Sequence, residues 1–263
     1  MNNLSLTLRD STTMLRRDIQ HSLRRFSMTL SGLMVPIIML LLFNYVFGGA
    51  ISAGLGGVAH GGNYINYLAA GIIIMTVGSG CATTAINLCM DMSEGIIARF
   101  RTMAISPASV LIGQVLGSLL RTILSVILVT LVALLIGFRP TANPIAWLAA
   151  LGLIALITFA ITWMGVAFGL VGKTPAGANS LSLLFQLLAF TSSAFVNPDS
   201  MPAGVRWFAQ YQPFTPVIDT LRGLLLGTPI SGSSAILALA WCLILTLLGY
   251  LWSRSIYNRD PVK

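Results

Sequence analysis

Long apolar segments constrain the fold of this chain more than any other feature of its sequence. Hydrophobic residues make up 56% of the 263 residues and charged residues only 8%, and a transmembrane helix needs about 20 apolar residues. Six segments approach or exceed that length: Gly32–Gly48, Tyr64–Met90, Val110–Gly137, Ile145–Val171, Ala178–Val196 and Ala235–Trp252. The sequence therefore predicts an all-α integral membrane protein with six transmembrane helices in a single domain, residues 1–263. The remaining polar stretches are too short for a soluble ATPase domain.

The positions of the basic residues indicate how these spans are oriented, because Lys and Arg concentrate in cytoplasmic loops. With the N-terminus inside, three arginines lie outside, Arg121 lies in a span, and eleven basic residues lie inside. The outer ones are Arg139, Arg206 and Arg222; the inner ones are Arg9, Arg16, Arg17, Arg24, Arg25, Arg99, Arg101, Lys173, Arg254, Arg259 and Lys263. We expect a multi-pass protein of the bacterial inner (cytoplasmic) membrane with both termini in the cytoplasm. This topology and anionic membrane lipids explain the net charge of +8, and nucleic-acid binding is not indicated.

A charged island, Asp91–Pro107, separates the second and third apolar segments. It holds two of the seven acidic residues, Asp91 and Glu94, and two arginines, Arg99 and Arg101. Such a stretch belongs in water at one membrane face. Apolar residues recur along it at helical spacing: Ile96, Ile97, Phe100 and Met103. The pattern predicts a short amphipathic cytoplasmic helix that is available to bind a partner protein.

Residues 5–27 are expected to form an N-terminal amphipathic helix at the membrane interface. Its apolar residues recur at helical spacing, and its arginines occupy other faces: Leu15, Ile19, Leu23 and Phe26 against Arg16, Arg17, Arg24 and Arg25. An Arg-rich amphipathic helix before a span suits the inner interface, with the arginines at lipid phosphates. A solvated arm is the alternative.

The outer segment, residues 197–234, is too apolar for a solvated loop and too broken by proline for a span. Its prolines are Pro198, Pro202, Pro213, Pro216 and Pro229. They predict two short helices, Ala203–Gln210 and Pro216–Leu226. Aromatic residues on such non-spanning helices indicate a structure that dips into the outer leaflet.

Small or polar residues recur every three to four positions in several spans and indicate close helix packing. They are Gly71, Ser79, Thr83 and Asn87; Gly113, Gly117, Arg121 and Ser125; Thr158, Thr162, Gly165 and Gly169; and Asn179, Ser182, Gln186 and Ser193. Gln186 is the exception, because a mid-span amide needs a partner. Gln186, Phe185 and Phe190 are the candidate residues of the substrate path. For Arg121 we favour a structural role, reaching the inner headgroups, over contact with substrate.

Enzyme and metal chemistry are not indicated. His21 and His60 fall in different compartments, so they cannot share a metal, and the sequence has no phosphate-binding loop. The cysteines lie in apolar spans without metal or redox spacing, and we expect no disulfide: Cys81, Cys89 and Cys242. No carboxylate lies in the core of a predicted span, which weakens the interpretation as an ion-driven carrier. Energy for uphill transport is then expected to come from another protein.

Two motifs resemble those of a known family. Glu94–Met103, EGIIARFRTM, is similar to the E-G-x-x-x-R-[FL]-R coupling-helix segment of type-2 ABC exporter permeases. Asn197–Gly223 is similar to the outer re-entrant element of the same family. The similarity lies in four short sequence motifs, N-P, M-P, Q-P-F-T-P and L-R-G. Together with the topology, these motifs make the chain resemble the daunorubicin-resistance-like (Drr-type) transmembrane subunits. The chain departs from the family pattern at one point. The family often has a proline soon after the methionine of this motif, whereas here the proline that follows Met103 is Pro107. The residue at which the coupling helix ends is therefore not defined by the motif.

The resemblance implies a non-catalytic permease subunit in an ATP-driven exporter of an amphipathic drug, antibiotic or lipid-like molecule. It implies a separate ABC ATP-binding subunit that carries ATP and Mg, and a second permease copy, most simply a homodimer. The coupling residues would be Glu94, Gly95, Ile96, Arg99, Phe100 and Arg101, and the re-entrant element would include Pro198, Pro202, Pro213, Pro216 and Arg222. A self-sufficient channel or secondary carrier and a membrane scaffold or assembly factor stay open as alternatives.

Overall fold

The computed structural model describes residues 26–48, 64–93 and 107–259, and every regular element in these ranges is a helix. The elements are α2 (Phe26–Leu41), η1 (Leu42–Phe47), α4 (Tyr64–Ser93), α6 (Pro107–Ile136), α7 (Pro144–Val171), α8 (Pro175–Phe190), η2 (Pro198–Ser200), α9 (Ala203–Tyr211), α10 (Phe214–Leu226) and α11 (Gly232–Arg259). η1 is a π-helical continuation of α2, and η2 is a single 3-10 turn. The predicted all-helical class is confirmed for this part of the chain.

A helix lies at the position of each predicted span, but the helices differ in length. Four of those described are long and apolar enough to cross a membrane: Tyr64–Ser93, Gly113–Ile136, Pro144–Val171 and Gly232–Ile256. Two are shorter apolar helices, Leu33–Phe47 and Pro175–Phe190. These lengths describe a multi-pass membrane protein, whereas the count of six spans stays a prediction. Residues 5–25 of the predicted interfacial helix and residues 94–106 of the island lie outside the described residues.

Several helix ends differ from the predicted ones; α11, for example, ends at Arg259 and not at Trp252. α4 continues through Asp91–Ser93, so the first residues of the island are helical. The fifth segment was expected to remain helical to Val196, but α8 ends at Phe190. Just beyond that end, the Ser192 hydroxyl donates to the Ala189 carbonyl oxygen at 2.5 Å. Such local side-chain bonds compete with continuation of a helix.

Capping residues and prolines begin α7 and α8. The side chain of Asn143 accepts the backbone N–H three residues later at 2.7 Å, and Pro144 is the first helical residue. Thr174 does the same at 3.1 Å, followed by Pro175. An N-cap acceptor satisfies a free helical N–H, and proline at the first position lacks the N–H that would otherwise need a partner. Both helix starts therefore follow from local sequence.

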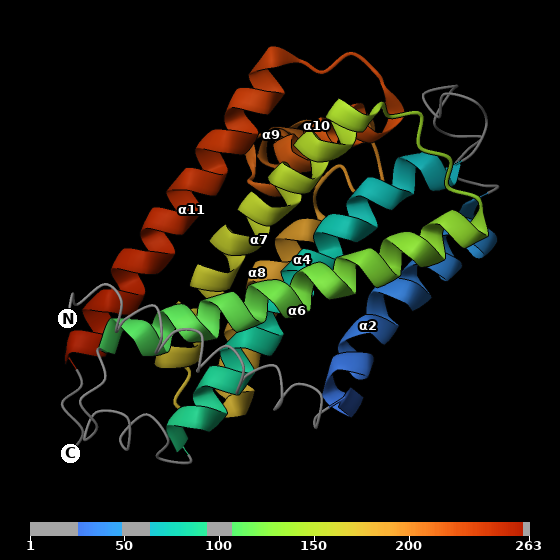
Figure 1. The fold of residues 1–263 in the computed structure, drawn as a ribbon. Coiled ribbons are helices and arrows are strands. Elements are labelled where there is room, and N and C mark those ends of the chain that lie inside the picture. Colours follow the sequence, from blue (N-terminus) through green and yellow to red (C-terminus); the bar gives the residue numbers. More distant parts are fainter. Residues whose placement is uncertain (1–25, 49–63, 94–106, 260–263) are drawn as a thin grey trace.

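α4 lies at the centre of the bundle, where it contacts α2, α6, α7, α8 and α10. α11 packs against α7 on one side, and α2 lies on the other (Figure 1). The short helices α9 and α10 lie at the end where α7 and α11 begin (Figure 1). The loop before α7 is held there too, because the Thr141 N–H donates to the Leu225 carbonyl oxygen at 3.0 Å. Two of the predicted outer segments thus meet at one end of the bundle.

Glycines allow α4 and α7 to approach closely. A Cβ added at Gly165 would lie 2.8 Å from the carbonyl oxygen of Cys81, and one at Gly169 would lie 2.8 Å from that of Ala85. Backbone cannot move aside as a side chain can, so these positions exclude larger residues. The small residues of the fourth segment therefore serve helix packing, as their spacing predicts.

Gly165→Ala is expected to lower the free energy of unfolding by about 1–3 kcal/mol, the usual cost of overpacking. The matched control is Gly152→Ala in the same helix, where an added Cβ meets nothing within 4 Å. That control is expected to leave stability unchanged or slightly higher, because Ala favours helix over Gly. Thermal unfolding of the purified variants in detergent measures both. Equal midpoints for the two variants would contradict the close contact between α4 and α7.

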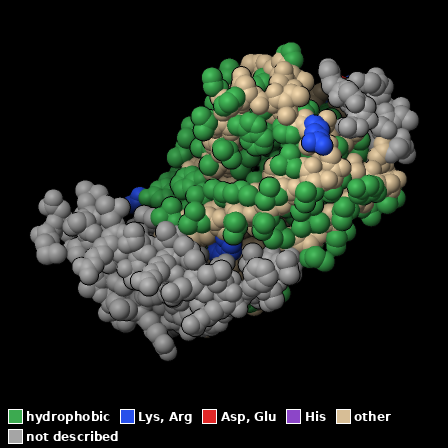
Figure 2. Space-filling view, turned by 45° about the vertical axis from the view of Figure 1, so that its right-hand side comes forward, with side chains coloured by type: hydrophobic (Ala, Val, Ile, Leu, Met, Phe, Trp, Pro, Cys, Tyr) green, Lys and Arg blue, Asp and Glu red, His purple; other side chains and the backbone are tan. Residues whose placement is uncertain are grey.

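Apolar side chains cover the outside of the bundle. Hydrophobic residues make up most of the described surface on the face shown in Figure 2. Several point fully outward, such as Leu135 at 87% exposed, Ile145 at 77% and Ile236 at 70%. A soluble monomer rarely exposes so much apolar surface. This surface suits the hydrocarbon of a bilayer.

Candidate functional site

The two short helices predicted in the outer segment are present, as α9 and α10. Pro202 and Pro213 are the residues directly before them. α10 ends at Leu226 and is followed by Gly227, which has the left-handed φ of 63°. The two helices differ in burial: α10 is largely buried, with Pro216 inside it, whereas α9 turns Trp207 outward at 67% exposed. α10 is therefore part of the core, and α9 lies at the surface.

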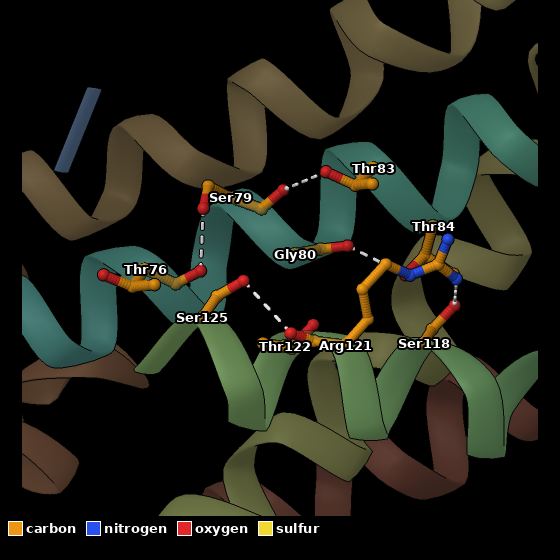
Figure 3. Close-up of a pocket in the computed structure, with 9 residues that line it drawn as sticks. All are labelled: Thr76, Ser79, Gly80, Thr83, Thr84, Ser118, Arg121, Thr122 and Ser125. Carbon is orange, nitrogen blue, oxygen red and sulfur yellow. Dashed lines mark hydrogen bonds between the residues drawn. The ribbon is translucent and has the colours of Figure 1, made fainter. Parts of the chain in front are cut away.

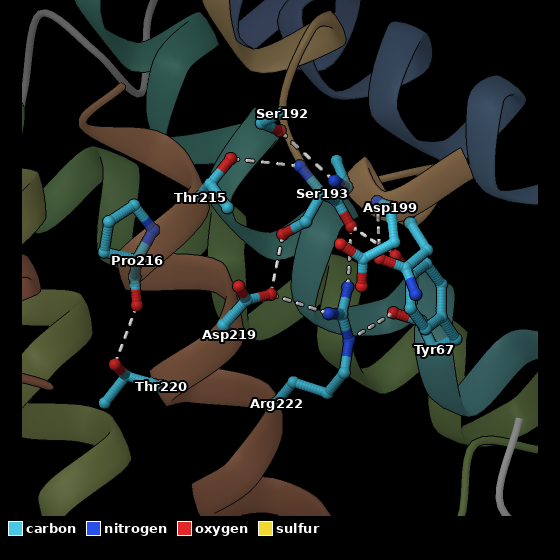
Figure 4. A network of polar contacts seen from close by, with 11 residues as sticks. Tyr67, Ser192, Ser193, Asp199, Thr215, Pro216, Asp219, Thr220 and Arg222 are labelled. Atoms are coloured by element: carbon cyan, nitrogen blue, oxygen red, sulfur yellow. Dashed lines mark hydrogen bonds and ion pairs between the residues drawn. The ribbon is translucent and has the colours of Figure 1, made fainter. Parts of the chain in front are cut away.

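Arg222 on α10 is the centre of a polar network at this end of the bundle (Figure 4). Its Nη1 donates to Asp219 Oδ1 at 2.9 Å and its Nη2 to the Ser193 carbonyl oxygen at 2.8 Å. Its Nε donates to the Tyr67 carbonyl oxygen at 3.3 Å, and the guanidinium lies 3.7 Å from the centre of the Tyr67 ring. The Arg222 side chain is only 15% exposed. One side chain thus ties α10 to α4 and to the segment after α8.

Further hydrogen bonds fix the segment after α8. The Ser193 hydroxyl donates to Asp219 Oδ1 at 2.7 Å, and the Ser193 N–H donates to Thr215 Oγ1 at 3.2 Å. The next residue, Ala194, lies so close to α4 that a Cβ at Gly71 would come within 2.6 Å of its Cα. The network therefore holds the outer segment rigidly against α4.

A second polar feature is a cavity between α4 and α6 (Figure 3). Its volume is about 20 Å³, enough for one water-sized group. Seven hydroxyl residues, one glycine and one arginine line it: Thr76, Ser79, Thr83, Thr84, Ser118, Thr122, Ser125, Gly80 and Arg121. No carboxylate is among these lining residues, and Arg121 is the one charged residue among them.

Arg121 extends from α6 into this cavity (Figure 3). Its Nη2 donates to the Ser118 hydroxyl at 3.2 Å. Arginines in membrane segments are costly unless they face protein or a polar cavity, and the cavity between α4 and α6 meets that need. The predicted approach to the inner headgroups stays a prediction, while the structure adds a polar interior site for the same side chain.

Comparison with known proteins decides the family. The ABC-2 type transporter family matches residues 10–226, most of the chain. The chain belongs to the ABC-2 type transporter family. A daunorubicin resistance ABC transporter permease protein, DrrB1, of Streptomyces coeruleorubidus is 28% identical over 197 residues, 74% of this chain and 67% of the relative. The probable doxorubicin resistance permease DrrC of Mycobacterium tuberculosis (strain ATCC 25618 / H37Rv) is 23% identical over 210 residues, 79% and 73% of the two chains. The putative transport permease ycf38 of Porphyra purpurea is 22% identical over 220 residues, 83% and 74%.

The family match identifies the chain as an ABC-2 membrane permease, and the relatives are named as transport permeases. The predicted Drr-type resemblance is confirmed. Membership in the family agrees with the apolar bundle and with its long apolar helices.

The predicted substrate-path residues of this ABC-2 permease have different surroundings on α8. Gln186 faces α4, where its Cγ lies 3.8 Å from the place of a Cβ on Gly78. Phe185 packs between Phe168 and Phe214, with ring centres 5.9 Å and 5.5 Å away. Phe190 is 37% exposed and stacks on another phenylalanine. None of the three lines the cavity between α4 and α6, so their role in a substrate path stays a prediction.

The predicted coupling residues, 94–101, lie outside the described residues of this permease, between the end of α4 and the start of α6. The sequence marks Ser79, Thr83 and Ser125 as parts of packing stripes, and it marks Arg121 also as a side chain that reaches the inner headgroups. It did not single out the remaining cavity residues: Thr76, Gly80, Thr84, Ser118 and Thr122. The available signal was the cluster of three hydroxyl residues within four positions of Arg121 on one helix.

Proposed function

We propose that this chain is the membrane permease subunit of an ATP-driven exporter. Its substrate would be an amphipathic drug, antibiotic or lipid-like molecule that leaves the cell. A separate ABC ATP-binding subunit would supply the energy and carry ATP and Mg. The relatives named as daunorubicin and doxorubicin resistance permeases support export of such molecules.

The observation that carries this proposal is the family match over residues 10–226. The match includes the whole charged island and the outer segment through α10. In this proposal a second chain converts ATP hydrolysis into movement. Binding of ATP would then close two ATPases and rock two permease copies, most simply a homodimer, between two arrangements.

The proposed contact with the ATPase is the segment between α4 and α6. Its arginines would pair with acidic groups on the ATPase through charge-assisted hydrogen bonds. The proposed coupling residues are Glu94, Gly95, Ile96, Arg99, Phe100 and Arg101. The same proposal places six spans in the bacterial inner membrane, with this segment and both termini in the cytoplasm, the basic N-terminal helix on anionic lipids, and α9 and α10 at the outer face.

Reconstitution into vesicles tests the proposal. Transport of a fluorescent amphiphile is expected only when the permease, its ABC ATPase and MgATP are all present. Transport by the permease alone would indicate a channel or carrier. A tight complex with a partner that does not bind nucleotide would indicate a scaffold. Either result would overturn the proposed function.

A further inference from the structure

Gln186 on α8 carries a side-chain amide that a single copy of the chain leaves without a hydrogen bond. The side chain is partly buried, and no hydrogen bond joins it to any residue in the described ranges. The hydroxyl groups of the same helix differ from it, because Ser180 donates to the Ala176 carbonyl oxygen at 3.0 Å and Ser182 to that of Ala178 at 2.9 Å. The amide of Gln186 therefore has donors and an acceptor to offer to another molecule.

The position of Gln186 along α8 makes an unpaired amide costly. Lys173 is exposed and comes just before α8, which places the start of this helix near a membrane surface. Gln186 follows Pro175, the first residue of α8, by eleven residues, about 16 Å along the helix. The hydrocarbon layer is about 30 Å thick, so the amide lies close to its middle. Lipid chains offer an amide no partner, so protein or water has to cover it.

Gln186 belongs to a row of side chains along α8 that the described part of the bundle leaves wholly or partly uncovered. The row is Asn179, Leu183, Gln186 and Phe190, at intervals of four, three and four residues. Asn179 is exposed, Leu183 is 52% exposed and Phe190 is 37% exposed. Other sides of α8 contact α4, α7 and α10. Alternating intervals of four and three residues are those of a coiled-coil seam, along which two helices pack side by side.

A second copy of the chain has the chemistry that this row needs. Two copies with the same membrane orientation are related by a two-fold axis along the membrane normal, so their α8 helices run parallel and present the same residues to each other. An amide is complementary to itself in such a pair, because its NH₂ group donates and its carbonyl oxygen accepts. The row holds no charged side chain, so two identical rows do not repel each other.

We infer that two copies of this chain associate along α8, with the two Gln186 side chains hydrogen-bonded to each other across the two-fold axis. Leu183 and Phe190 would pack against their counterparts, about one turn before and one turn after the amide pair. Asn179 would add a second polar contact near the start of the helix. This inference rests on the proposed function, because it names the surface that joins the two permease copies.

Disulfide cross-linking of the full-length permease in membranes tests this contact, without ATPase or nucleotide. Leu183→Cys lies in the row. Leu184→Cys is the matched control, because it lies at the same depth but roughly 100° away around the helix, and the two leucines are 52% and 65% exposed. With a copper oxidant, Leu183→Cys is expected to form linked dimers at least about tenfold faster, because a disulfide needs Cα atoms within about 7 Å of each other. The unmodified protein is expected to form none, because its own cysteines are buried: Cys81, Cys89 and Cys242.

Gln186→Leu tests the amide pair itself. Energy transfer between labelled copies of the permease, measured as vesicles are diluted with lipid, gives the dimerisation constant. The variant is expected to dimerise about sevenfold more weakly, which is the effect of two interhelical hydrogen bonds at their average measured strength in membrane proteins. The matched control is Ser180→Leu, at an exposed polar residue of α8 outside the row. It is expected to dimerise as the unmodified protein does.

Three results would overturn the inference. The first is unchanged or tighter dimerisation of Gln186→Leu, which is expected if this amide faces a substrate path or water. The second is an equal loss in Ser180→Leu. The third is cross-linking through Leu135→Cys, at an 87% exposed position on α6, without cross-linking through Leu183→Cys, which would place the contact on another face.

These measurements are independent of ATP-driven transport. Because neither ATPase nor nucleotide takes part, a failed transport assay leaves a contact along α8 standing. Absent cross-linking and unchanged dimerisation in turn leave ATP-driven transport standing.

Discussion

Arg99→Glu combined with Arg101→Glu is expected to abolish co-purification of the ABC ATPase and ATP-driven export, while the permease itself stays folded. Both arginines belong to a segment that resembles the coupling helix of ABC-2 permeases. Reversing two charges would place glutamates opposite the acidic groups proposed for the ATPase, and such like-charge contacts cost several kcal/mol. A loss of affinity of at least about 100-fold follows from that cost.

The matched control reverses two charges elsewhere on the predicted cytoplasmic side, Lys173→Glu with Arg254→Glu. Both side chains are exposed in the structure, so the control changes net charge equally without touching the coupling segment. Pull-down of the tagged permease, size-exclusion chromatography and vesicle transport are measured for both variants. Normal export by the Arg99 and Arg101 variant, or equal losses in the control, would remove this segment as the site of coupling.

Helix positions in this protein follow closely from local sequence. The predicted second segment begins at Tyr64, as α4 does, and the fourth begins one residue after Pro144, where α7 starts. The two outer helices were also placed within one or two residues of α9 and α10. Proline, capping residues and apolar length act over a few positions, so a single sequence reveals them.

The end of α8 depends on partners far away in the chain. Ser193 bonds with Asp219 and Thr215 on α10, and its carbonyl oxygen accepts from Arg222 and Tyr67. Hydropathy alone continues the helix through this stretch, because Ala194, Phe195 and Val196 are apolar. These contacts span up to 126 positions in the sequence, and no local pattern predicts them.

The sequence predicts only part of the cavity between α4 and α6, because the cavity also depends on contacts between distant segments. The stripe containing Arg121 and Ser125 marks one face of α6, and that containing Ser79 and Thr83 marks one face of α4. Spacing along each helix does not say that these two faces meet. The crossing is set by small residues such as Gly80, where an added Cβ would clash with Thr122, and such a pairing appears only in three dimensions.

Arg222→Met is expected to destabilise the permease by about 2–4 kcal/mol, because one change removes three hydrogen bonds and leaves the Asp219 carboxylate without its cation. Breaking a fully buried pair costs about 3–5 kcal/mol. Asp219 is 38% exposed, and water that reaches its carboxylate lowers that cost. Thermal unfolding in detergent measures the loss. Arg139→Met, an exposed arginine at the same end of the bundle, is the control and is expected to change little.

A double-variant cycle separates the ion pair from the contacts to backbone. Asp219→Asn removes the negative charge, so adding it to Arg222→Met is expected to restore part of the lost stability. The remainder belongs to the carbonyl oxygens of Tyr67 and Ser193, which lose the hydrogen bond from Arg222 in either case. If the double variant is less stable than Arg222→Met alone, an uncompensated Asp219 charge is not the source of the loss. If Arg222→Met is as stable as Arg139→Met, Arg222 does not hold the outer segment to α4.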